Sequence, residues 1–156
     1  MKRFLVSIAL LLVVSAMFIS CNKDSAGTPI GSYPQKIVGT WQLVQWDYHY
    51  QGEIESRQDE VETCYIFKNN GKMSMTSSRS PYMNNVEYDY SLSGNHITIK
   101  AGMMNQTYDI IKLTDTEMQF QVGGNSPIIG MLNSLANAFE DTGRQCDKVD
   151  MFFTKK

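Results

Sequence analysis

Charge is scarce in this sequence, and neither sign dominates it. Charged residues make up 19% of the chain and the formal net charge is −2, with no basic stripe along any segment. Proteins that bind nucleic acids usually gather lysine and arginine on one face to neutralise phosphates. We therefore expect no nucleic-acid partner.

Histidine is rarer still, because only His49 and His96 occur in the chain. Zinc needs three or four converging ligands, and the strand pattern below puts these two residues near opposite ends of the fold. No Ser-His-Asp, Cys-His or paired-carboxylate pattern typical of catalysis stands out. The sequence thus predicts no metal site, no cofactor and no enzymatic activity.

Cysteine occurs three times. Cys21 closes an N-terminal apolar segment, which leaves Cys64 and Cys146. In an oxidising cell envelope an even pair is compatible with a disulfide, worth up to about 4.5 kcal/mol in a chain-entropy argument. The other interpretation is two buried thiols too far apart to meet, and the sequence leaves both open.

Residues 1–20 have the layout of a secretory signal peptide. Lys2 and Arg3 supply positive charge, and Phe4 to Phe18 is apolar apart from two serines. That run is shorter than the roughly 20 residues of a membrane-spanning helix, and no block of charge follows it. We therefore interpret residues 1–20 as a cleaved signal.

The segment Phe18-Ile19-Ser20-Cys21 resembles the lipobox of bacterial lipoproteins. The resemblance implies that Cys21 is acylated and becomes the mature N-terminus, anchored in a membrane because more than one acyl chain gives stable retention. It also implies an outer-membrane location, facing the periplasm or the cell surface, because Asn22 stands where aspartate would favour the inner membrane.

Residues 21–36 lack hydrophobic periodicity and contain two glycines and two prolines. That composition is typical of a flexible tether, which would hold a domain away from the membrane. The remaining residues, 37–156, have the length of one domain with a sizeable core.

From Thr40 onward the chain alternates apolar and polar residues in short segments rich in β-branched and aromatic residues. One helical pattern interrupts them, between the last two strands, where apolar residues recur at helical spacing up to Phe139. The eight predicted strands are Thr40–Tyr50, Val61–Lys68, Lys72–Ser77, Val86–Leu92, His96–Ala101, Thr107–Leu113, Glu117–Val122 and Lys148–Thr154.

Eight sequential strands without a long crossover predict an all-β fold, an up-and-down antiparallel β-barrel, which has no exposed edges. The even-numbered connections are short. The first (Gln51–Glu60), the third and the seventh are long, and the fifth (Gly102–Gln106) is intermediate. Odd and even connections lie at opposite ends of such a barrel, so we expect one end sealed by tight turns and a mouth at the other.

The tripeptide Gly39-Thr40-Trp41 opens the first strand at the sealed end. Gly39 lets the chain turn tightly, and Trp41 offers a large apolar side chain that can plug this end of the core. Together with the strand count and the turn pattern, these residues resemble the lipocalins, and more closely the lipocalin-like lipoproteins of Bacteroidetes-type bacteria. The resemblance covers about residues 37–156 and implies a lipocalin-like (calycin) barrel.

Methionine and aromatic side chains alternate onto the faces that we expect to point inward. A barrel of eight strands is just wide enough to be filled or to hold one small ligand, and such linings adapt to varied apolar molecules. We therefore expect a small apolar or amphipathic molecule to bind near the mouth. The candidate ligand-binding residues are Met75, Tyr88, Tyr108, Phe120, Met131, Leu135 and Met151.

The predicted helix, Ser126–Phe139, has one apolar stripe that must be buried against something. Ser126 can cap its N-terminus and Pro127 suits its first turn. One interpretation is a brace on the outside of the barrel, and the other is a lid over the mouth.

A second class of function competes with ligand binding. Loops at the open end could bind a protein, for example as an enzyme inhibitor, and the acidic segment Asp59–Glu62 would suit a basic target. A cavity of about 300 Å³ or more inside the barrel would favour a small ligand, and a filled interior would favour the loops.

Overall fold

The computed structural model describes residues 33–79, 81, 84, 86–139 and 144–156. The predicted signal peptide and the lipid attachment at Cys21 lie outside these residues. Within them, no helix is long and apolar enough to cross a membrane.

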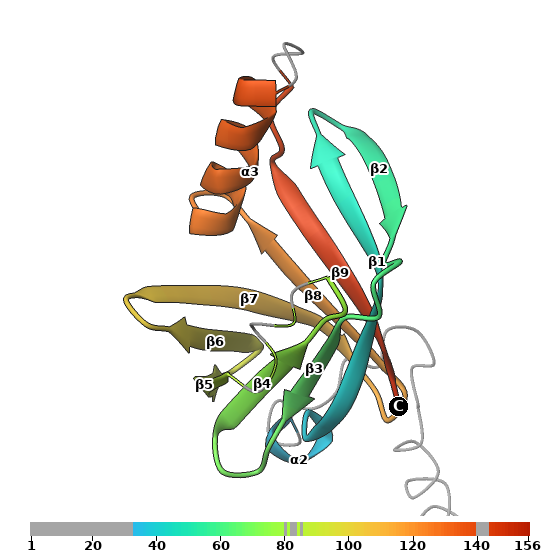
Figure 1. The fold of residues 1–156 in the computed structure, drawn as a ribbon, viewed down its shortest axis with the longest axis vertical. Coiled ribbons are helices and arrows are strands. Elements are labelled where there is room, and N and C mark those ends of the chain that lie inside the picture. Colours follow the sequence, from blue (N-terminus) through green and yellow to red (C-terminus); the bar gives the residue numbers. More distant parts are fainter. Residues whose placement is uncertain (1–32, 80, 82–83, 85, 140–143) are drawn as a thin grey trace, which may run out of the picture.

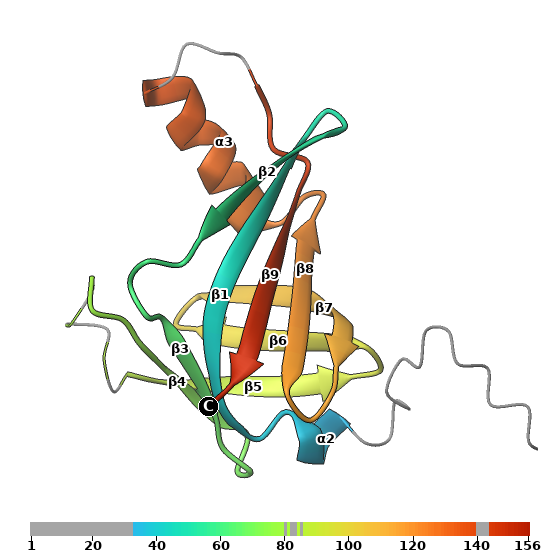
Figure 2. The same ribbon diagram turned by 90° about the vertical axis from the view of Figure 1, so that its right-hand side faces the viewer.

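The described chain consists of nine strands and two helices, arranged mainly as consecutive antiparallel pairs (Figures 1 and 2). The elements are α2 (Tyr33–Lys36), β1 (Gly39–Tyr50), β2 (Glu53–Gln58), β3 (Cys64–Phe67), β4 (Lys72–Thr76), β5 (Glu87–Ser93), β6 (His96–Ala101), β7 (Met104–Leu113), β8 (Glu117–Gly123), α3 (Pro127–Phe139) and β9 (Lys148–Lys155).

The predicted eight-stranded barrel with a helix before the last strand is confirmed. β1 and β3 to β9 form the closed wall, because β1 pairs with β3 on one side and with β9 on the other. Alternation sets which face points inward. Along β5, for instance, Tyr88, Tyr90 and Leu92 are partly buried while the residues between them are exposed.

β2 is an additional strand, in a segment that the sequence analysis assigned to a connection (Gln51–Glu60). β1 is much longer than β3, so its second half extends past the end of β3 and pairs with β2 on that side, from Gln45↔Gln58 to Tyr50↔Glu53, while it stays paired with β9 on the other side. Gln51 and Gly52, both at positive φ, make the two-residue turn typical of a hairpin. The nearly all-polar sequence of β2 gave no apolar alternation from which to predict it.

The fifth connection is also shorter than predicted. Ala101 pairs directly with Met104, so only Gly102 and Met103 form the turn between β6 and β7. Gly102 has a φ of 61°, which glycine adopts at little cost. One of the connections at the open end is therefore tight.

Trp41 and α2 fill the closed end. Trp41 is fully buried, and its indole Nε1–H donates to the Ile37 carbonyl, with an N···O distance of 2.7 Å. α2 occupies the last residues of the predicted tether and lies below the barrel (Figure 1). Gly39 has a φ of 138°, and a Cβ there would lie 2.8 Å from Cε of Lys155. The positive φ is what favours glycine here, since the flexible Lys155 side chain could move away from a Cβ.

A possible Cys64–Cys146 disulfide, which the sequence left open, is not formed, and both thiols are free and buried. Cys64 begins β3 opposite Gln42, whereas Cys146 precedes β9 at the level of His49. Gln42 and His49 are separated by roughly 20 Å along β1, at about 3.3 Å per residue. A disulfide needs Cα atoms within about 7 Å, so the register of β1 keeps the cysteines apart.

Candidate functional site

A pocket of about 470 Å³ lies between strands β3 to β7 and the first turns of α3. Its volume exceeds the roughly 300 Å³ that marks a small-molecule site. The lining residues are Tyr65, Met73, Met75, Tyr88, Ile99, Ala101, Asn105, Gln106, Tyr108, Pro127, Ile128 and Met131.

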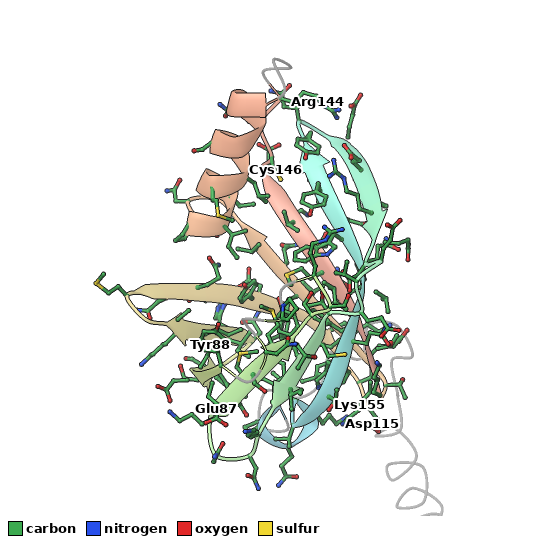
Figure 3. The ribbon with its side chains drawn as sticks, viewed as in Figure 1. Glu87, Tyr88, Asp115, Arg144, Cys146 and Lys155 are labelled. Atoms are coloured by element: carbon green, nitrogen blue, oxygen red, sulfur yellow. The ribbon has the colours of Figure 1, made fainter. Side chains whose placement is uncertain are left out.

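Strand alternation puts apolar side chains inside and charges outside at this wall. Tyr88 lines the pocket while its neighbour Glu87 is exposed and pairs with Lys68 on the outer surface. Lys72 pairs with Asp89 in the same way, with an N···O distance of 2.6 Å. Figure 3 labels Glu87 and Tyr88, and it shows Asp115 and Lys155 at the closed end with Arg144 and Cys146 at the opposite end. None of the lining residues carries a formal charge.

The structure separates the candidate ligand-binding residues into three groups. Met75, Tyr88, Tyr108 and Met131 line the pocket. Phe120 and Met151 do not line it, and the side chain of Leu135 lies outside the described set.

Phe120 and Met151 belong to the core because the β8–β9 side of the barrel is already filled. They pair across β8 and β9 and are 0% and 1% exposed. The Phe120 ring stacks on Tyr108 at 5.7 Å between centroids and meets Phe153 edge-on at 5.3 Å. These residues are packed into the core, and the pocket lies on the side of β3 to β7.

Several lining residues were missed by the sequence analysis. Tyr65 and Met73 are on strands whose alternation had been recognised, so extending the inward face along each strand would have found them. Asn105 and Gln106 had been assigned to a loop and belong to β7. Ile128 was assigned to the helix stripe, but only tertiary structure brings it to the pocket.

Tyr65 and Tyr108 are the buried polar groups of the pocket, at 9% and 7% exposure. Burial raises the pKa of Tyr108 to about 12. Burial raises the pKa of Tyr65 still further, with a smaller contribution from the neighbouring Tyr108. Both phenols therefore remain neutral at physiological pH and can donate hydrogen bonds.

A model of the lipocalin-like domain family matches residues 37–120, more than half of the chain. The chain belongs to the lipocalin-like domain family. A search of curated proteins and a search of solved structures found no match. The matched stretch of this lipocalin-like chain contains all the strands that line the pocket, whereas α3 and β9 lie beyond it.

Polar contacts at both ends of its described part hold α3 against the lipocalin-like barrel. Ser126 Oγ accepts from the Ile128 N–H at 3.2 Å, as an N-cap, and donates to Gln106 Oε1 at 3.0 Å. Asn133 accepts from the Cys146 N–H at 2.7 Å and donates to the Cys146 carbonyl at 3.1 Å. The predicted cap is confirmed, and α3 is fixed on both sides of the residues that face the pocket.

A second, polar cavity of about 590 Å³ lies on the other side of α3. Its walls include Ser126, Asn133, Gln145 and Asp147. The Asp147 carboxylate already accepts a hydrogen bond from the Gln51 N–H at 2.8 Å, and Asn133 Oδ1 accepts one from the Cys146 N–H. This cavity lies between α3 and residues 145–147, the segment that leads into β9.

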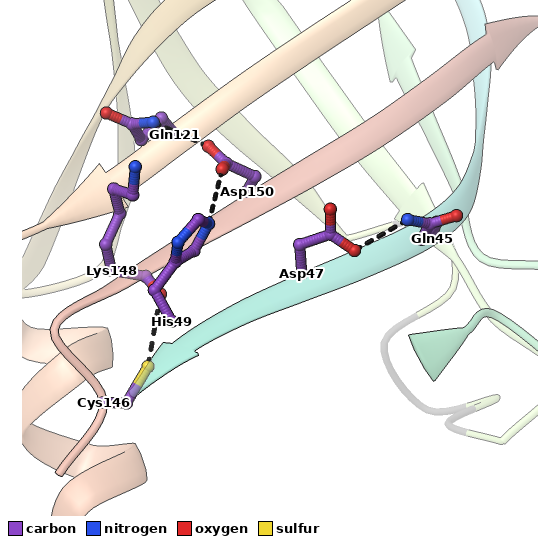
Figure 4. Close-up of polar contacts among 7 residues, drawn as sticks. All are labelled: Gln45, Asp47, His49, Gln121, Cys146, Lys148 and Asp150. Atoms are coloured by element: carbon purple, nitrogen blue, oxygen red, sulfur yellow. Dashed lines mark hydrogen bonds and ion pairs between the residues drawn. The ribbon is translucent and has the colours of Figure 1, made fainter. Parts of the chain in front are cut away.

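His49 takes part in a polar network on the face of the sheet opposite to Met151 (Figure 4). Its Nε2 lies 2.8 Å from Asp150 Oδ2, and Gln121 Nε2 donates to Asp150 Oδ1 at 2.7 Å. Both carboxylate oxygens of the buried Asp150 are thereby satisfied, which is what burial of a charged group requires. The network stabilises the sheet and does not face the pocket.

His96 is on β6, separated from Asp150 on β9 by two intervening strands, and its Nδ1 lies 2.5 Å from Asp109 Oδ1. Among the residues that the structure describes, no three His, Cys, Asp or Glu side chains are grouped so as to hold a metal ion. Burial raises the pKa of the Cys146 thiol, which disfavours the nucleophilic thiolate.

Proposed function

We propose that this protein binds a small, largely apolar molecule in the pocket under α3 and performs no chemistry on it. The observation that carries the proposal is the 470 Å³ pocket lined by methionine, aliphatic and tyrosine side chains without a formal charge. Apolar walls with a few polar groups are the usual composition of small-molecule sites. Membership of the lipocalin-like family also suggests small-molecule binding.

We further propose that the protein is an envelope lipoprotein, acylated at Cys21 and held in the outer membrane. The lipobox-like sequence before Cys21 supports this. The arrangement of the domain agrees with it, because α2 lies at the closed end while α3 and the pocket lie at the other (Figures 1 and 2). An anchor that precedes α2 would leave the mouth accessible to a ligand.

We also propose that α3 acts as a lid. Ile128 and Met131 line the pocket from above, and Met131 is 56% exposed, so it covers the opening without being locked in the core. Ile129, on another face of the helix, is 4% exposed and packs into the core. Opening such a lid would break the hydrogen bonds between Asn133 and Cys146, and α3 would tilt about its N-terminal end.

Binding at this pocket can be tested by filling it. Ala101 lines the pocket at the open end of β6, and Ala101→Trp should place an indole in the free volume. We expect this variant to lose most of its affinity for an environment-sensitive apolar dye while it stays folded. Lys100→Trp is the matched control, because Lys100 is exposed on the outer face of the same strand.

Mass spectrometry of small molecules that co-purify with the protein would name the natural ligand. The Ala101→Trp variant should carry less of that molecule than the unmodified protein. Equal dye affinity in the unmodified protein and both variants would contradict the assignment of the pocket as the binding site.

A protein-binding function remains a second proposal, now on a different surface. Asp59 is engaged internally, since its carboxylate accepts from the Thr63 N–H at 2.7 Å, which weakens the acidic loop as a docking site. In the hairpin of β1 and β2, Trp46, Tyr48 and Tyr50 instead form a half-buried row, stacked at 6.2 and 6.5 Å between centroids. The guanidinium of Arg57 lies over the Tyr48 ring and that of Arg144 over the Tyr50 ring. Aromatic residues of this kind are enriched in protein interfaces.

The hairpin proposal has a test that leaves the pocket untouched. Tyr48→Ser and Tyr50→Ser should abolish capture of a protein partner from an envelope extract and leave dye affinity unchanged, because neither residue lines the pocket. Retained capture by the double variant would rule this surface out.

A further inference from the structure

Two phenol hydroxyls in the pocket have no hydrogen-bond partner among the residues that the structure describes. Tyr65 and Tyr108 are each more than nine-tenths buried, and neither hydroxyl makes a hydrogen bond to another described residue. Every fully buried side-chain nitrogen or oxygen in the described part of the chain does have a partner. The two hydroxyls are therefore reachable from the pocket, and a ligand is the natural group to satisfy them.

Their position in the pocket is defined by the aromatic core residues that their rings contact. The Tyr65 ring meets Phe153 edge-on at 5.1 Å, and the Tyr108 ring stacks on Phe120. Both rings are thus held at the inner end of the pocket. Met131 contributes to the wall at the α3 end, where it is 56% exposed.

The walls of the pocket would not compensate a buried charge. No lysine, arginine or histidine is among the lining residues, and the nearby Lys68 and Lys72 are engaged with carboxylates on the outer surface. Removing an ion from water without a partner is costly. A neutral acceptor can instead take a hydrogen bond from a phenol without that cost.

We propose, on the basis of the ligand-binding function above, that the pocket takes an uncharged amphipathic molecule with an ester, ketone or alcohol oxygen bound by the hydroxyls of Tyr65 and Tyr108. Its apolar body extends from that inner end towards Met75 and α3. The raised pKa values of both phenols agree with this, because they show that the inner end disfavours negative charge.

A series of probes that share one alkyl chain and differ in head group tests the inference. Methyl dodecanoate, dodecanol, dodecane and dodecanoate would each be titrated against a bound apolar dye on the full mature protein at pH 8. We expect the ester and the alcohol to bind about fivefold or more tightly than dodecane, the effect of one net hydrogen bond. Dodecanoate should bind more weakly than its methyl ester.

Variants that remove only the hydroxyls test which residues are responsible. Tyr65→Phe and Tyr108→Phe together should reduce the affinity for the ester to that for dodecane and leave dodecane binding unchanged. Tyr90→Phe is the matched control, because its hydroxyl already donates to the Lys68 carbonyl at 2.8 Å and the residue does not line the pocket. A thermal melt of each variant confirms that it is folded.

The outcomes separate this inference from the function on which it rests. If the dye and all four probes fail to bind, the ligand-binding function itself is wrong. If they bind without a preference for the ester over dodecane, or if the double variant keeps that preference, only the phenol site is wrong. Tightest binding by dodecanoate would also overturn it, because it would place an anionic head at a cation outside the pocket, such as the exposed Arg79.

Discussion

Replacing Trp41 tests the packing of the closed end most directly. The side chain is 0% exposed, and Ile37, whose carbonyl it binds, is also 0% exposed. Trp41→Ala leaves a large cavity, and such substitutions cost about 3–5 kcal/mol. The substitution also leaves the buried Ile37 carbonyl without its donor, a penalty of about 1–3 kcal/mol that partly overlaps with the cavity cost.

Trp41→Phe divides this cost into its parts. Phenylalanine keeps most of the apolar contact but cannot donate to Ile37, so we expect a loss of about 1–3 kcal/mol from the unsatisfied carbonyl and the smaller ring. α2 should lose order first, because the indole hydrogen bond ties the end of that helix to β1.

The measurement is the free energy of unfolding from urea titrations followed by circular dichroism. Trp46→Ala is the control, because Trp46 is only partly buried and lies in the half of β1 that extends past β3 and pairs with β2. We expect its cost to be less than half that of Trp41→Ala. A loss below about 1 kcal/mol for Trp41→Ala would refute the conclusion that this residue closes the core.

Three other predictions follow from the backbone, the thiols and the N-terminus. Gly39→Ala should destabilise the fold by about 1–3 kcal/mol because of its positive φ. Gly130→Ala, in an open position on α3, should be neutral or stabilising. Urea melts with the opposite ranking would contradict this. Cys64 and Cys146 should both react with a thiol reagent in the unfolded, unreduced protein, and absence of both thiols there would establish the disulfide. In the folded protein, Cys146 should react only at a pH above the usual thiol range, because burial raises its pKa. Cys21→Ala should move the protein from the membrane fraction to the soluble fraction, and an unchanged distribution would exclude lipid attachment at that residue.

The sequence predicted the barrel because its evidence is local. Alternation is visible within single strands, most clearly around Tyr88 and Tyr90. The tight turns have their own short signals, glycine with asparagine after β3 and after β5, and Thr-Asp-Thr after β7. Gly39 and Trp41 identify the closed end because a positive φ and a large apolar plug are properties of single residues. The capped start of α3 at Ser126 was predicted for the same reason.

Tertiary structure alone decided which inward residues face empty space. Alternation assigns Phe120, Met151 and Tyr108 to the same interior, but Phe120, Met151 and Phe153 are packed into the core on the β8–β9 side, and the pocket lies at β3 to β7. Local pattern contains no information on how side chains from distant strands share a volume.

Strand lengths and register decided the remaining features. β2 exists because β1 extends past the short β3 and offers a free edge, although the β2 sequence itself has no apolar alternation. Cys64 and Cys146 remain apart because they pair with opposite ends of β1. Both outcomes depend on contacts between segments remote in sequence, which are fixed only when the barrel closes.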